Sequence, residues 1–275
     1  MQDLIIPSSP RLAITVAGHG PLVILVHGLG GDRSAWNKQV AALQDRYTAV
    51  SVDLRGYGDS DDPPGPIQFK QDFCADMVAV MDYFQAPRAH LVGLSMGGRV
   101  ARTTALQVPE RVASLTLANT SPGFDHLEPA QLEAFVTARS SAIINHQLPP
   151  GFGRQQALGM MAPGTPEAII QTMAQAVDRL RVDNYLNTLR ASTLQDRGDR
   201  LEDIACPVLL ITSDLDTVYP ASITESMLAR IPQATLTRIS GAGHISNLEQ
   251  PEAFNRALIH FLDALPREAD ARATA

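Results

Sequence analysis

The stretch that decides the fold of this chain is Gly93-Leu94-Ser95-Met96-Gly97. It follows the apolar run 89–92 and precedes the helix-compatible segment 99–106, so it predicts a sharp turn from a buried strand into a helix. A serine on such a turn takes strained backbone angles, which is why small residues must flank it. Ser95 would stand exposed at a helix N-terminus, where backbone N–H groups face a developing negative charge. A glycine-rich turn with an unreactive serine fits the same five residues, and the rest of the chain decides between the two.

The composition limits the kinds of protein to consider. The chain has 275 residues, of which 45% are hydrophobic and 19% charged, as in a large α/β domain or a domain with an insertion. A net charge of -7 argues against nucleic acid as a partner, because no basic patch offsets phosphate repulsion. Residues 1–7 lack the basic and apolar parts of a signal peptide, and no apolar run approaches the roughly 20 residues of a membrane span. We therefore expect a cytoplasmic protein without a membrane partner.

The two cysteines, Cys74 and Cys206, lie far apart, and neither has further metal-ligating residues beside it. Two buried thiols in a reducing compartment are favoured over a single disulfide. We therefore expect no bound metal.

Strand and helix patterns alternate along most of the chain. The continuous apolar run Leu22–Val26 is typical of a strand buried on both faces of a parallel sheet. The predicted strands are 12–16, 22–26, 48–52, 89–92, 112–117, 208–212 and 234–239. The predicted helices between and after them are 35–43, 69–84, 99 to about 107, 222–231 and 251–265. This alternation predicts βαβ units in a mostly parallel sheet with right-handed crossovers.

The alternation breaks between about Thr120 and Leu201, where the patterns are helical and no convincing strand is found. The predicted helices in this region are 129–145, 154–161, 166–180 and 182–194. An all-helical insertion can form a second domain or a lid over an active site. We therefore divide the chain into a core of residues 1–120 and 201–266, a helical insertion of residues 121–200, and a flexible tail of residues 267–275.

Acyl transfer by a serine needs a base, a carboxylate that orients the base, and donors for the oxyanion. Asp216 and Asp214 both follow the predicted strand 208–212, at the sheet edge where open α/β sheets place their chemistry. Either carboxylate can instead cap the helix that follows. His244 lies in the glycine-containing loop between the last predicted strand and helix. These residues come in the order serine, acid, histidine that this kind of turn uses.

The loop His27–Gly31 follows the first buried strand and can aim a backbone N–H at the carbonyl oxygen of a substrate. The N–H groups of Leu29 and Met96 are the predicted oxyanion hole. The loop lacks the glycine spacing and the Gly-Lys-Ser/Thr of nucleotide-binding loops. We expect His27 to hold the loop through hydrogen bonds rather than to act as a base.

The stretch 53–60 also follows a predicted strand and carries charged residues. A second catalytic carboxylate is one interpretation. The favoured one is a tight loop shaped by Gly56 and Gly58 and tied internally by Asp53 and Arg55.

Together these elements resemble the α/β-hydrolase superfamily over residues 10–265. The shared features are His27-Gly28, Trp36, the stretch 53–60, the turn at Ser95, the strand before Asp216, and Gly243-His244. Within the superfamily, residues 117–120 and 244–254 are similar to the 3-oxoadipate enol-lactonases and their esterase relatives. The resemblance implies an α/β-hydrolase fold, a mostly parallel sheet flanked by helices, with a helical cap formed by the insertion. It aligns Asp216 rather than Asp214 with the acid, so Ser95, Asp216 and His244 would be the catalytic triad.

The activity that the resemblance implies is hydrolysis of a small-molecule ester or lactone through an acyl-enzyme, with no metal or organic cofactor. Five arginines in the insertion either meet a carboxylated lactone or lie on solvent-facing helices: Arg139, Arg154, Arg179, Arg181 and Arg190. Carbon–carbon bond hydrolysis of a vinylogous diketone and a non-catalytic ligand-binding role remain as alternatives, with Leu94 favouring the ester or lactone. Haloalkane and epoxide hydrolysis need a carboxylate where Ser95 stands. The oligomeric state does not follow from the sequence.

Overall fold

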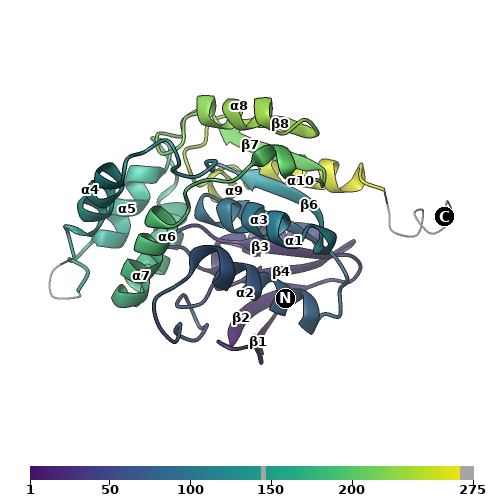
Figure 1. Ribbon diagram of the computed structural model, residues 1–275, viewed down its shortest axis with the longest axis horizontal. Helices are drawn as coiled ribbons and strands as arrows, with labels where there is room; N and C mark the ends of the chain where they lie inside the picture. The colour runs from purple at the N-terminus through teal and green to yellow at the C-terminus, as the bar shows by residue number, and fades with distance from the viewer. Residues whose placement is uncertain (144–146, 267–275) are drawn as a thin grey trace.

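At the centre of the computed structural model, which describes residues 1–143 and 147–266, lies an eight-stranded β-sheet (Figure 1). Its strands are β1 (Gln2–Ile6), β2 (Leu12–Ala17), β3 (Leu22–Val26), β4 (Thr48–Val52), β5 (Ala89–Leu94), β6 (Val112–Ala118), β7 (Val208–Ser213) and β8 (Ala234–Ile239). They lie in the order β1-β2-β4-β3-β5-β6-β7-β8. The pairs β1–β2 and β2–β4 are antiparallel and all later pairs are parallel. The predicted mostly parallel sheet is confirmed.

The edge strand β1 is absent from the predicted strands. Its five residues pair with β2 from Gln2 opposite Val16 to Ile6 opposite Leu12. Ile6 is the only one of the five whose side chain is buried. The apolar run Leu4–Ile6 is therefore too short to mark a strand in the way that the interior strands are marked, although Ile6 joins the core and the backbone completes the sheet.

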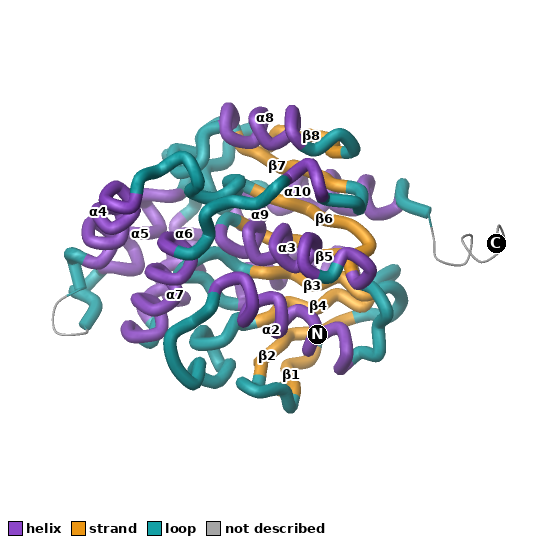
Figure 2. Tube along the Cα trace, viewed as in Figure 1, coloured by secondary structure: helices purple, strands orange, loops and turns teal. Residues whose placement is uncertain are grey.

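Helices cover both faces of the sheet, as Figure 2 shows. These helices are α1 (Asn37–Leu43), α2 (Phe69–Tyr83), α3 (Met96–Gln107), α8 (Ala221–Arg230), α9 (Ser246–Glu249) and α10 (Pro251–Asp263), with short 3₁₀ turns at Arg33–Trp36, Pro109–Arg111 and Leu201–Asp203. On one face Ile24 belongs to the same cluster as Met77 of α2; on the other Leu25 belongs to the cluster of Phe254 of α10. Successive residues of one strand therefore pack into two different cores, as a sheet covered on both faces requires.

The helix predicted over residues 35–43 is two elements. A 3₁₀ turn over Arg33–Trp36 comes first, and its N-cap Asp32 accepts the N–H of Ser34 over 3.0 Å. Trp36 then leaves helical geometry, with φ -107° and ψ 4°, before α1 begins at Asn37. The short helix α9 is also absent from the predicted helices. The other predicted core helices agree with the structure to within a few residues.

Four helices lie between β6 and β7, gathered beside one end of the sheet at the left of Figure 1. They are α4 (Pro129–Ser140), α5 (Phe152–Met160), α6 (Glu167–Asp178) and α7 (Val182–Leu194). Helix α5 packs on α6, and α4 packs on α7 through Val136 and Leu189. The predicted helix 129–145 in fact ends at Ser140, and positions 144–145 lie outside the described residues, as does the predicted tail 267–275.

Both cysteines are free and buried, as predicted. Burial raises the pKa of the Cys206 thiol to about 11, so it stays protonated near neutral pH. Across residues 1–143 and 147–266, no helix is long and apolar enough to cross a membrane.

Candidate active site

Ser95 occupies the sharp turn between β5 and α3, with φ 56° and ψ -119°. A positive φ at a residue other than glycine costs about 1–3 kcal/mol and must be held by its surroundings. The Ser95 N–H donates to the carbonyl oxygen of Ala118 over 2.9 Å. Its own carbonyl oxygen accepts the Thr120 hydroxyl at 2.6 Å and the Gly98 N–H at 3.0 Å. The neighbouring strand β6 and the residues after it therefore fix the strained turn.

The glycines that flank Ser95 are required by close contact rather than by their own backbone angles. Neither Gly93 nor Gly97 has a positive φ. A Cβ on Gly93 would collide with the carbonyl group of Gly97, and a Cβ on Gly97 would collide with the carbonyl oxygen of Val26 at the end of β3. The two glycines thus allow β5, α3 and β3 to approach one another closely at the serine.

His244 and Asp216 form a buried hydrogen-bonded pair. Nδ1 of His244 lies 3.0 Å from Oδ2 and 3.2 Å from Oδ1 of Asp216. The N–H groups of Val218 and Tyr219 donate to Oδ1 of Asp216 over 2.8 and 2.9 Å. Burial alone would raise the pKa of Asp216, but the His244 ring and the polar donors outweigh it, so this pKa lies below its usual range. The carboxylate is therefore ionised and can orient the histidine.

Asp214, the alternative acid, points elsewhere. Its side chain is exposed, and Oδ1 accepts the N–H of Gly241 over 2.8 Å. Of the two carboxylates, the one that meets His244 is Asp216.

Asn119 is a site residue that the sequence analysis did not find. It follows β6, is fully buried, and has a φ of 43°. Its Nδ2 donates to Oδ2 of Asp216 over 2.9 Å and to the Ser213 hydroxyl over 2.6 Å, while its Oδ1 accepts the Ser246 hydroxyl at 2.6 Å. Asparagine tolerates the left-handed backbone better than most residues do. Two signals in the sequence point to this position: an asparagine directly after a buried strand, and the resemblance of residues 117–120 to the lactonases.

His27 holds the loop after β3, as expected. Its Nε2 accepts the N–H of Leu54 over 3.1 Å, so Nδ1 carries the proton and donates to the Gly28 carbonyl oxygen over 2.8 Å. Burial lowers the pKa of His27, which keeps the ring neutral. Gly28 packs against the serine, since a Cβ on it would lie 3.3 Å from Cβ of Ser95.

The N–H groups of Leu29 and Met96 are free to donate. Within the described part of the chain, neither of them forms a hydrogen bond to another protein group. Leu29 and Met96 line the same cavity as Ser95. This arrangement leaves two backbone donors beside the serine.

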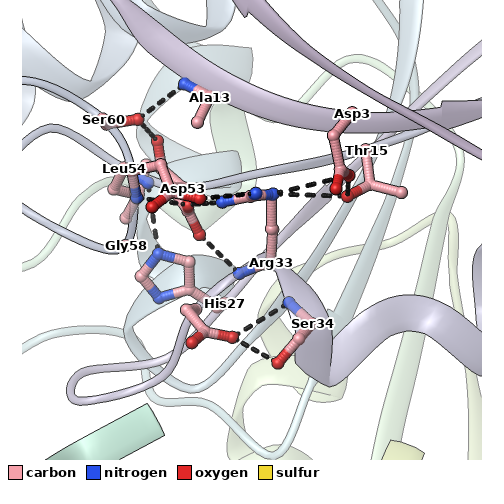
Figure 3. Close-up of polar contacts among 12 residues, drawn as sticks. Asp3, Ala13, Thr15, His27, Arg33, Ser34, Asp53, Leu54, Gly58 and Ser60 are labelled. Atoms are coloured by element: carbon pink, nitrogen blue, oxygen red, sulfur yellow. Dashed lines mark hydrogen bonds and ion pairs between the residues drawn. The ribbon is translucent and has the colours of Figure 1, made fainter. Parts of the chain in front are cut away.

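Asp53 anchors the loop that follows β4. Its carboxylate is fully buried, forms an ion pair with Arg33, and accepts the Arg33 N–H over 2.7 Å. Figure 3 shows the Arg33 guanidinium lying between Asp53 and Thr15, whose hydroxyl accepts from its Nε over 3.3 Å. A Cβ on Gly58 would collide with the Asp53 carboxylate, so the loop closes tightly around it. Asp53 is thus committed to structure.

The expectation that Arg55 ties this loop internally is wrong. Its guanidinium leaves the loop and pairs with Asp72 and Asp76 of α2, at 2.7 Å in each case. The carboxylates of the loop itself, on Asp53 and Asp59, both pair with Arg33 instead, so Arg55 pairs with the two carboxylates of the helix.

A cavity that is partly open to solvent is lined by four of the five predicted site residues, while Asp216 contacts His244 from outside this lining. Ser95 and His244 both line it, with Trp36 and Tyr219 from the core. The inserted helices supply the rest of its wall, including Phe135, Met160, Met173 and Leu189. The cavity is therefore mostly apolar and lies between the core and the inserted helices.

Two arginines also line this cavity. Arg99 is buried and bound to Asp196 and to the Ser192 carbonyl oxygen, at 3.0 and 2.7 Å, but its Nε has no partner among the described residues. Arg139 lies over the Phe135 ring at 5.0 Å and has no carboxylate partner in the described part of the chain. The other four of the five arginines named above pair elsewhere: Arg154 with Glu167, Arg179 with Asp32, Arg181 with Asp62 and Arg190 with Glu133.

A mostly parallel sheet with a strained serine after β5 and an Asp–His pair after β7 and β8 defines an α/β-hydrolase fold. The chain belongs to the family described as alpha/beta hydrolase fold, whose model matches residues 21–251.

Particular members of that family are similar over most of their length. The chain is 31% identical over 242 residues to 3-oxoadipate enol-lactonase 2 of Acinetobacter baylyi, which covers 86% of this chain and 87% of that protein. It is 31% identical over 254 residues to a protein of Caulobacter segnis named for carbamate hydrolysis (RutD), which covers 90% of this chain and 93% of that one. A thermophilic esterase from Thermogutta terrifontis, solved with malate bound, superposes with a TM-score of 0.84 at 26% identity, covering 96% of this chain and 98% of that one.

Proposed function

We propose that this protein is a serine hydrolase that cleaves a carboxylic ester or lactone through an acyl-enzyme. The observation that carries the proposal is the hydrogen bond from His244 Nδ1 to the ionised, buried Asp216, with Ser95 in the same cavity. The similar enol-lactonase and esterase support hydrolysis of this bond class. The inserted helices, residues 121–200, would act as a cap that encloses the substrate.

In this mechanism the proton on Nδ1 of His244 is shared with Asp216, which leaves Nε2 free to act as the base. Nε2 takes the proton of the Ser95 hydroxyl while Oγ attacks the carbonyl carbon. The N–H groups of Leu29 and Met96 bind the oxyanion, and the imidazolium then protonates the leaving alkoxide or enolate. Water, deprotonated by the same nitrogen, releases the acid and restores Ser95.

Arg139 supports an acidic substrate. A guanidinium at the wall of an apolar cavity, without a carboxylate partner, is suited to pair with a carboxylate of the substrate. The similar lactonase is named for an oxo-dicarboxylic acid, and the similar esterase was solved with the dicarboxylate malate. Arg139→Gln should raise KM for a hemi-ester of a dicarboxylic acid about tenfold, and leave KM for an uncharged ester of equal length unchanged.

Covalent labelling tests the main proposal. The wild-type protein should react with a fluorophosphonate probe and show a burst of p-nitrophenol with p-nitrophenyl acetate. Ser95→Ala should abolish both and lower ester turnover by several orders of magnitude. Ser226→Ala, which changes an exposed serine of α8, is the matched control and should keep both.

Each other outcome points to a different function. Absence of label and burst from the wild-type protein would favour a ligand-binding protein on this fold. A label without ester turnover, but with cleavage of a vinylogous diketone or a carbamate, would assign the serine to that substrate instead.

A further inference from the structure

The carboxylate of Glu249 is buried behind His244, at the end of α9. The residue is 8% exposed, and no ion pair to it is found among the described residues. Four donors surround it instead. Oε2 accepts the N–H of Ala162 at 2.7 Å and the N–H of Gly243 at 3.0 Å, and Oε1 accepts the N–H of Ile245 at 3.1 Å. Oε2 also lies 3.1 Å from the hydroxyl of Thr165, whose one proton it shares with the Ala162 carbonyl oxygen at 2.8 Å. Burying a carboxylate costs free energy unless hydrogen-bond donors satisfy its oxygens, and here four donors do so.

Two of these donors flank the histidine. Gly243 and Ile245 are the residues before and after His244, so Glu249 holds the backbone on both sides of it. The N–H of His244 itself donates to the carbonyl oxygen of Met160 over 2.7 Å. The N–H groups of three successive residues are therefore hydrogen-bonded, and these bonds fix the position of the His244 backbone from which the imidazole extends.

The other two donors belong to the inserted segment. Ala162 and Thr165 lie in the connection between α5 and α6, and Met160 ends α5. A Cβ on Gly243 would lie 2.6 Å from the N atom of Ala162, so the two backbones touch. The loop that carries His244 is thus bound to the insertion as well as to the core.

We infer that Glu249 is a positioning residue, which couples the α5–α6 connection to His244 and sets the distance from that histidine to Ser95. The inference rests on the proposed function, since it assigns a role relative to the base. Asp216 orients the ring through Nδ1, whereas Glu249 fixes the backbone from which the ring extends. Glutamine at this position can accept hydrogen bonds at one atom only. Either the N–H of Ile245 or the N–H groups of Gly243 and Ala162 would then lose their acceptor.

The test compares Glu249→Gln with Asp214→Asn. Asp214 is the matched control, because its carboxylate also accepts one N–H of the same loop, from Gly241, but does not flank His244. Glu249→Gln should lower kcat for an ester about tenfold, with KM within about twofold, because the loss falls on the transition state. The far-downfield proton NMR line of the His244–Asp216 hydrogen bond should shift or broaden in this variant. Asp214→Asn should leave kcat, KM and that line unchanged.

Thr165→Val serves if Glu249→Gln does not fold, since it removes one donor on the insertion side and keeps the carboxylate. It should lower kcat about threefold with KM unchanged. A folded Glu249→Gln protein with wild-type kcat and an unmoved proton line would overturn the inference, as would an unchanged kcat in Thr165→Val when Glu249→Gln is unfolded. If the wild-type protein takes no fluorophosphonate label on Ser95, the proposed function has failed, and that outcome is separate from the other two.

Discussion

Asn119 donates its side-chain N–H to Oδ2 of Asp216 over 2.9 Å. Asn119 follows β6, and Asp216 follows the neighbouring strand β7. The carboxyl ends of β6 and β7 meet here, with Ala118 paired to Ile211. The backbone of Asn119, at φ 43°, directs the Asn119 side chain toward the Asp216 carboxylate, which therefore depends on this neighbour. The acid of the site is set by the strand beside it as much as by its own loop.

Removing this donor should slow the chemistry. Asn119→Gly keeps the positive φ but lets the Asp216 carboxylate turn away from His244. A hydrogen bond to a charged group contributes about 1.5–3 kcal/mol, so kcat should fall about tenfold or more. The measurement is steady-state hydrolysis of a p-nitrophenyl ester. Ser246→Ala, which removes a bond to Asn119 but none to Asp216, should lose less; equal losses in the two variants would contradict this account.

A methyl group on Gly28 should disturb Ser95 with little effect on folding. Gly28 has no positive φ, so alanine fits its backbone, but the added Cβ would lie 3.3 Å from Cβ of Ser95. A displacement of about 1 Å costs roughly a hundredfold in rate, so a few tenths of an ångström should lower kcat about fourfold. Gly65→Ala is the control, because no atom lies within 4 Å of its Cβ position. A Gly28→Ala enzyme as active as Gly65→Ala would show that the serine has room to spare.

The fold followed from the sequence because its signals are local. The strand of Leu22–Val26 is marked by a run of apolar residues, and the turn at Ser95 by glycines that must let β3 and α3 approach. The edge strand β1 carries only a short apolar run, Leu4–Ile6, of which Ile6 alone is buried, although the backbone pairs with β2 along all five residues. Sequence patterns therefore predict the strands that have long buried runs and miss a strand that has a short one.

The site followed in part. Ser95, Asp216 and His244 can be ranked by motif and order along the chain. Asn119 and Glu249 lie in the stretches that resemble the lactonases, but their contacts with Asp216 and Ala162 join residues 97 and 87 positions apart. Such contacts follow from the fold and not from the neighbouring residues in the sequence. The five arginines show the same limit: only the packing of α4 against α7 decides that Arg139, and not the others, faces the cavity.

Acid should weaken the fold through His90 in β5. Its burial, with a smaller contribution from the charge of Arg88, lowers the pKa of His90 to about 4. The unfolded chain takes up this proton near pH 6.5, so the unfolding free energy should fall as pH drops from about 6.5 to about 4, by about 1.4 kcal/mol per pH unit. His90→Asn should make that slope shallower, as measured by urea unfolding at several pH values. Parallel slopes in the two proteins would rule out this contribution.

The buried ion cluster beneath the insertion should be the most sensitive point for stability. Asp196 is fully buried and pairs with Arg99 at 3.0 Å and with Arg102 at 2.6 Å, and Arg102 also pairs with Asp199 at 3.0 Å. Among the described residues, Asp196 is thus the carboxylate that both guanidinium groups share. Breaking a buried pair leaves an uncompensated charge and costs about 3–5 kcal/mol. Asp196→Asn should lower the urea unfolding free energy by that amount. Glu167→Gln, which breaks the exposed pair with Arg154, should cost less than about 1 kcal/mol. Arg99 also lines the cavity. The destabilised protein should lose ester turnover in proportion to its folded fraction. A folded, fully active Asp196→Asn protein would mean that Arg99 and Arg102 find other acceptors.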